Sequence, residues 1–261
     1  MKKLMILFLF LIPFVLVSCG DDNGNDIDND DIQNVEKNKE EANNKEEKKE
    51  EQVIKKVADY TNYVECINEF IARFAKIEKY EKISKGKTET WVNQDIDCSV
   101  SRDGNKYRIY NTAKSAFKDT YHEAIFEDKV KYKNKANDEF SETTLAEYKK
   151  EYGVTPYDNT LFDYVITNDT VSKIERKEEN GKYTFTIDLN VNSDATKYIK
   201  VQMQKLPELS EYPKFKSIKL TLVIDDDFKP YTGKIESEYD VKYLFLNPSC
   251  KQNLDINFII G

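Results

Sequence analysis

The stretch LTLVIDDDFKPYTGKIESEYDVKYLF, residues Leu220–Phe245, reads as two β-strands joined by a turn. Leu220, Leu222 and Ile224 recur at every second position before the run Asp225-Asp226-Asp227. Such alternation gives a strand one apolar and one polar face, which is typical of antiparallel sheets with one buried face. The stretch therefore predicts an antiparallel hairpin.

The same period of two recurs in three other parts of the chain. It covers Tyr183–Val191 after the turn signal Glu179-Asn180-Gly181, and it covers Leu254–Ile260 near the end. Ile96–Val100 also alternates, and the turn residues of Arg102–Asn105 follow it. We therefore expect these strands to form an antiparallel sheet with one apolar and one polar face.

Helical spacing appears ahead of the strands. Apolar residues at intervals of three and four predict one long amphipathic helix over roughly residues 53–80. The apolar stripe consists of Tyr60, Val64, Ile67, Ile71, Phe74 and Ile77 or Glu78, and Phe70 widens it. We expect this helix to pack on the sheet.

Three shorter helices are expected between strands. Thr144 and Glu147 form a capping box, and Gly153 marks the end of that helix. A second helix is expected over residues 159–166 with Asp158 as its cap, and a third over residues 193–206. Together the elements predict a single α+β domain over residues 53–261, with a curved, half-barrel-like antiparallel sheet packed on one long N-terminal helix.

The N-terminus has the pattern of an export signal. Lys2 and Lys3 precede the apolar run Leu4–Val17, which is shorter than the ~20 residues of a membrane-spanning helix. The sequence Leu16-Val17-Ser18-Cys19-Gly20 resembles the lipobox of bacterial lipoprotein signal peptides. The resemblance implies a signal peptide over residues 1–18, a diacylglyceryl group on the Cys19 thiol, and export to the outer face of the cell membrane. An uncleaved anchor helix and an ordinary secretory signal are the alternatives.

Charge separates a tether from the domain. Residues 20–52 contain 13 acidic residues and 5 lysines, which accounts for the whole net charge of −8. With almost no apolar residue, the segment 19–52 is expected to be an acidic, disordered tether. The nearly neutral remainder lacks a basic block, so nucleic-acid binding is not expected.

No catalytic or metal-binding motif is recognisable. His122 is the only histidine and is expected to be exposed on a strand. Asp26, Asp28 and Asp30 have calcium-loop spacing, but Asp31 and Lys37 occupy positions that need Gly and Glu. The run Asp225-Asp226-Asp227 is expected to be a solvated turn. We therefore predict no catalytic residue, no metal and no cofactor.

The cysteines and the single tryptophan are the remaining candidates for functional residues. Beyond Cys19, the three cysteines Cys66, Cys98 and Cys250 are expected to be buried or half-buried thiols, with one disulfide as the alternative. Trp91, the only tryptophan, is expected to face a polar side or groove mouth and to contact a ligand.

The order of elements and the hairpin at Leu220–Phe245 are similar to those of the half-barrel lipoprotein-carrier and mycobacterial lipoprotein groups. That resemblance implies an apolar groove able to hold acyl chains. The expected function is a membrane-anchored, non-enzymatic lipoprotein that binds a hydrophobic or amphipathic ligand in such a groove. The alternative is an envelope-structural or surface-interaction lipoprotein with a fully packed sheet; protein partners are not predicted.

Overall fold

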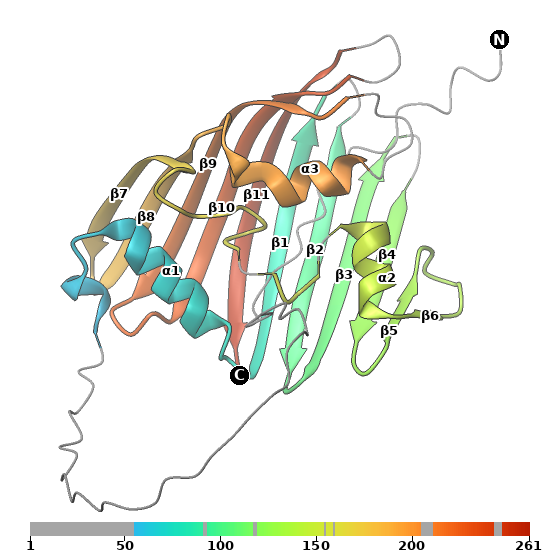
Figure 1. Cartoon of the computed structure of the whole chain (residues 1–261), viewed down its shortest axis with the longest axis horizontal. Helices are drawn as coiled ribbons and strands as arrows, with labels where there is room; N and C mark the ends of the chain where they lie inside the picture. The colour runs from blue at the N-terminus through green and yellow to red at the C-terminus, as the bar shows by residue number, and fades with distance from the viewer. Residues whose placement is uncertain are drawn as a thin grey trace, which may run out of the picture.

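One antiparallel sheet of eleven strands dominates the computed structural model (Figure 1). The structure describes residues 55–90, 93–116, 119–153, 155–158, 160–204, 211–242 and 247–261, without the side chains of 201–204. The signal peptide expected over 1–18 and the tether expected over 19–52 lie outside the described residues. The strands are β1 (Lys79–Glu89), β2 (Gln94–Asp103), β3 (Lys106–Ser115), β4 (Thr120–Phe126), β5 (Val130–Lys133), β6 (Ser141–Thr143), β7 (Val171–Glu179), β8 (Lys182–Leu189), β9 (Lys214–Asp225), β10 (Pro230–Asp240) and β11 (Ser249–Ile260).

The sheet consists of two runs of neighbouring strands that meet in its middle. Its order is β6-β5-β4-β3-β2-β1-β11-β10-β9-β8-β7. The central pair, β1 and β11, is antiparallel and runs from Tyr80 opposite Ile260 to Glu89 opposite Lys251. Among the described elements, the first strand therefore pairs with the last.

Helices cover one face of this sheet, which we call the covered face (Figure 1). They are α1 (Tyr63–Phe74), α2 (Leu145–Tyr152) and α3 (Lys197–Gln204), with short 3₁₀ turns at Val57–Asp59 and Asp194–Thr196. Within the described residues, none of these helices is long and apolar enough to cross a bilayer.

The expected class, α+β built on one long N-terminal helix, is wrong, because the fold is mainly one β-sheet with short helices. The helix expected over 53–80 is only α1. Asn62 begins it by accepting hydrogen bonds from the N–H groups of Val64 and Glu65. Arg102 on β2 ends it by donating to the carbonyl oxygens of Ala75 and Ile77. The chain then enters β1, so Tyr80 lies on a strand.

The other local predictions had mixed outcomes. The capping box of Thr144 and Glu147 is confirmed, and Gly153 follows α2 in the left-handed conformation with φ 86°. The helix expected over 193–206 is present as the 3₁₀ turn and α3. The helix expected over 159–166 is absent from the described residues there, where Leu161 and Tyr164 form an isolated β-bridge instead.

The core lies between the covered face and the helices. The α1 stripe is buried there together with the apolar faces of β8 and β9. On the opposite face, cross-strand ion pairs such as Lys85–Asp97 (2.9 Å) are exposed to solvent and contribute little to stability.

Candidate functional site

The two site residues expected from the sequence, Cys19 and Trp91, both lie outside the described residues. Lipid attachment at Cys19 and ligand contact at Trp91 therefore stay predictions.

The apolar walls expected to enclose an acyl-chain groove pack against other side chains. Ile67 on α1 and Phe185, Ile187, Leu220 and Leu222 on the sheet are fully buried. Ring contacts join the two layers, with Tyr63 and Phe185 centroids 6.1 Å apart and Phe74 and Phe258 centroids 5.5 Å apart. These described side chains therefore pack on one another between α1 and the sheet.

A different part of the covered face is polar. The side of β1 that faces the helices carries Tyr80, Lys82, Ser84, Gly86 and Thr88, with no aliphatic side chain among them. Lys82 is 1% exposed. The most central strand of the sheet therefore brings hydroxyls and an ammonium group into the core.

Neighbouring strands extend this polar region, which we call the central polar strip. Its members are all buried on the covered face: Lys82, Ser84 and Thr88 on β1, Gln94 on β2, Asn111 on β3, Ser237 on β10 and Gln252 on β11. Thr88 lies opposite both Gln94 and Gln252 in the strand register, and Gln252 lies opposite Ser237. Four adjacent strands thus present a continuous polar row.

Several polar atoms of the strip have no hydrogen-bond partner among the described residues. They are Ser84 Oγ, Gln94 Oε1, both polar atoms of the Asn111 side chain, and Gln252 Nε2. Ser237 does donate to Gln252 Oε1 at 3.3 Å. Because a buried polar group without a partner costs ~1–3 kcal/mol, each of these atoms calls for an explanation, such as a bound molecule.

A tight turn covers part of the strip. Leu161 and Tyr164 exchange two backbone hydrogen bonds of 3.0 Å, and all four residues 161–164 are buried. Phe162 and Asp163 between them have φ values of 54° and 70°. This left-handed conformation costs roughly 1–2 kcal/mol for a residue other than glycine. We call this element the 161–164 turn.

The sequence did not reveal the strip because β1 has no apolar alternation. Its sequence KYEKISKGKTE places Tyr80 on the covered face and Ile83 on the exposed one. A period-two search finds strands with an apolar side, and a strand whose buried side is polar gives no such signal.

His122 is buried at 4% exposure, so its expected exposure on the strand is wrong. Its Nε2 lies 2.8 Å from the Tyr148 hydroxyl of α2, and its Nδ1 lies 2.8 Å from Asn134 Oδ1. Since the Asn134 oxygen only accepts, Nδ1 donates to it, and Nε2 of the neutral ring accepts from Tyr148. Burial lowers the pKa of His122. The ring holds α2 on the sheet, and Tyr148 is the buried residue of that helix.

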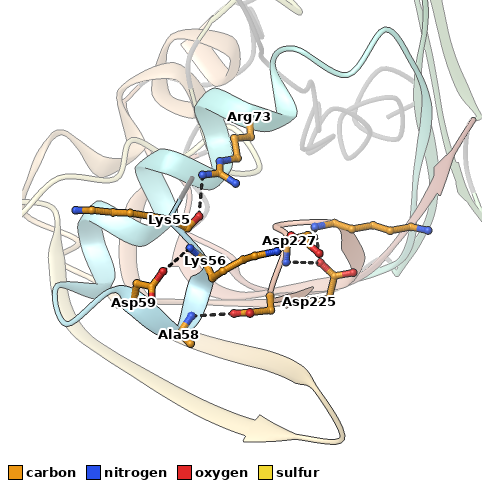
Figure 2. A network of polar contacts seen from close by, with 9 residues as sticks. Lys55, Lys56, Ala58, Asp59, Arg73, Asp225 and Asp227 are labelled. Atoms are coloured by element: carbon orange, nitrogen blue, oxygen red, sulfur yellow. Dashed lines mark hydrogen bonds and ion pairs between the residues drawn. The ribbon is translucent and has the colours of Figure 1, made fainter. Parts of the chain in front are cut away.

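The acidic run at the β9–β10 turn holds the start of the domain (Figure 2). Asp227 pairs with Lys56, and Asp226 accepts from the Ala58 N–H at 3.0 Å. Asp225 Oδ1 accepts from the N–H groups of Asp227 and Lys229, both at 2.9 Å. Among the described residues no group of His, Cys, Asp or Glu side chains has the arrangement of a metal site.

An open hollow of about 1190 Å³ lies at the end of the sheet formed by the β2–β3 and β4–β5 hairpins and the last turn of α1. Most of its lining side chains are charged, and they pair with one another, as in Lys106–Glu127 (2.9 Å) and Lys129–Glu142 (3.3 Å). This lining does not suit an acyl chain.

The cysteines of the domain are all buried. Burial raises the pKa of both the Cys66 and the Cys250 thiols to about 12, so neither is a reactive thiolate at neutral pH. Cys98 lies opposite Asn111, which lies opposite His122. Two strand spacings, about 9.5 Å, therefore separate Cys98 from the histidine, too far for a nucleophile and its base.

No protein family model matches the chain, and no curated protein matches it. Among solved structures, the dehydratase domain from the CurK module of curacin polyketide synthase is 12% identical over 69% of this chain and 76% of that one, with a TM-score of 0.14. An N-terminal dehydratase from the difficidin assembly line is 8% identical over 74% of this chain and 84% of that one, also with a TM-score of 0.14. Similarity at this level does not indicate a shared fold, and the absence of enzymatic activity stays a prediction.

Proposed function

We propose that this protein is an exported lipoprotein, anchored through Cys19 to the outer face of the cell membrane, whose domain binds a ligand without catalysing a reaction. The observation that carries the binding role is the central polar strip. Ser84, Gln94, Asn111 and Gln252 present buried polar atoms that lack partners among the described residues. A ligand that supplies those partners recovers the cost of burying them.

The ligand of this proposal is a polar or amphipathic molecule. A purely hydrophobic one is disfavoured, because the apolar side chains expected to line an acyl-chain groove pack on one another. The packing of α1 also favours the second candidate, a surface-interaction lipoprotein with a filled sheet and no small-molecule ligand. The two candidates differ in whether the central polar strip binds a ligand.

Native mass spectrometry of the full chain, purified from its own membrane in detergent, tests both parts of the proposal. We expect a mass that begins at Cys19 and carries acyl chains, together with an adduct of bound ligand. Asn111→Leu should remove the adduct. The matched control, Asn253→Leu on the exposed face of β11, should keep it.

Each part of the proposal has its own negative result. A chain without acyl groups would contradict the anchor. An acylated chain without an adduct, or an adduct equally retained in Asn111→Leu, would contradict ligand binding in the strip and leave the filled-sheet candidate.

A further inference from the structure

The 161–164 turn packs on the sheet beside the central polar strip. Phe162 lies over Gly233 of β10, where a Cβ atom would come within 2.5 Å of the Phe162 ring. The same ring has its centroid 5.7 Å from Lys82 Nζ and 6.3 Å from the Phe258 ring. Gly233, the Phe258 ring and the buried ammonium group of Lys82 thus surround the Phe162 ring. We call the space between these three residues, which Phe162 fills, the seat.

The seat lies in register with Ser84, one of the strip residues whose polar atoms have no hydrogen-bond partner among the described residues. Gly233 lies opposite Ile256 of β11, and Ile256 lies opposite Ser84 of β1. Ser84 is therefore in the same row as the seat, two residues from Lys82 on the same strand. Its hydroxyl Oγ has no partner among the described residues and is able to donate to a molecule in the seat.

The turn that fills the seat is held in an unfavourable conformation. Two-residue turns with positive φ at both central positions favour Asn and Gly, whereas here these positions hold Phe162 and Asp163. Backbone strain of this kind persists only where the surroundings impose it, and it occurs in segments that move on ligand binding. The turn also contains a buried aromatic ring followed directly by a buried carboxylic acid residue.

We propose that the 161–164 turn is a displaceable plug that occupies the ligand's place, and that the ligand is a small anion bearing a ring, of the aromatic carboxylate class. This inference rests on the proposed binding role of the strip. The ring of the ligand replaces the Phe162 ring over Gly233, Lys82 neutralises its carboxylate, and Ser84 donates a hydrogen bond to it. Release of the strained turn favours the exchange.

Benzoate is the probe for the first test, with the full chain in detergent and two readouts, calorimetric titration and amide hydrogen exchange. We expect benzoate to bind and to speed exchange of the Leu161 and Tyr164 amides at least tenfold, because their mutual hydrogen bonds break when the turn leaves. The amides within β10 should keep their protection. Benzyl alcohol, which has the ring without the charge, should bind at least tenfold more weakly.

Three variants make the test specific. Lys82→Met should weaken benzoate binding at least tenfold, whereas the control Lys85→Met, on the exposed side of the same strand, should leave it unchanged. Phe162→Ala should strengthen benzoate binding by emptying the seat, and this gain should vanish in the Phe162→Ala, Lys82→Met double variant. Thermal melting of each variant establishes that it is folded.

The inference is overturned if benzoate binds without faster exchange at Leu161 and Tyr164, or if neither the wild type nor folded Phe162→Ala binds it. Equal effects of Lys82→Met and Lys85→Met would also overturn it. If native mass spectrometry finds a neutral or ringless ligand that Asn111→Leu releases, the proposed function stands and the plug with its aromatic anion is wrong.

Discussion

Asn111→Leu in the ligand-free protein tests whether the buried polar side chains of the central polar strip lower the free energy of unfolding. The Asn111 side chain is 2% exposed, and neither its amide nitrogen nor its oxygen has a partner among the described residues. An unpaired buried polar group costs ~1–3 kcal/mol, and leucine has the same branched side-chain shape without that cost. We therefore expect the free energy of unfolding to rise by about 2 kcal/mol. For a domain of ~200 residues this raises the melting temperature by about 4–8 °C.

The assay is urea denaturation followed by circular dichroism, on protein refolded from denaturant so that any bound molecule is removed. Asn253→Leu, exposed on β11, is the control and should change the free energy of unfolding by less than about 0.5 kcal/mol. A loss of more than 1 kcal/mol in Asn111→Leu would show that the amide is satisfied in the ligand-free fold, and the reasoning about the strip would be refuted.

Three further outcomes are expected. Cys19→Ala should leave the chain uncleaved or released into the soluble fraction, because stable anchoring needs the acyl chains; unchanged processing and membrane attachment on fractionation would contradict this. Leu220→Ala should lower the free energy of unfolding by ~2–5 kcal/mol in urea denaturation, because Leu220 is fully buried on β9, and a cost below 1 kcal/mol would mean that the core is open there. Burial lowers the pKa of His122 from 6.5, so the unfolded chain binds more protons below that pH, and stability should fall as the pH drops from 7 to 5. His122→Gln should reduce that pH dependence, and an unchanged slope would exclude His122 as its source.

The antiparallel pairing of the strands was predictable from the sequence, and the length of α1 was not. Leu220, Leu222 and Ile224 pair with β10 in the expected hairpin, because alternation and the acidic turn act locally. The length of α1 depends on Arg102, which reaches the carbonyls of Ala75 and Ile77 from another element. A contact of this kind, 27 positions apart for Ala75, leaves no mark in a local helical pattern.

The central polar strip could not be predicted from the sequence, because it too depends on contacts between residues that are distant in the chain. The strip becomes visible only when Thr88, Gln94 and Gln252 are brought into one row by the register of three strands. Each residue alone is an ordinary strand residue. His122 was misjudged in the same way, since the tyrosine that buries it comes from α2, 26 positions later in the chain.

The pairing of β1 with β11 also sets the order of folding. While the chain is being synthesised, the run from β1 to β6 is complete before β11 emerges, and β1 then has one open edge. That edge closes only when residues 249–260 have been made, so the two halves of the sheet join only after nearly the whole domain has been synthesised. Contacts this distant in sequence are slow to form, and an unpaired strand edge invites association with other chains. A chain with this topology therefore depends on β11 to close the edge of β1 and to end the period in which that edge can associate with other chains.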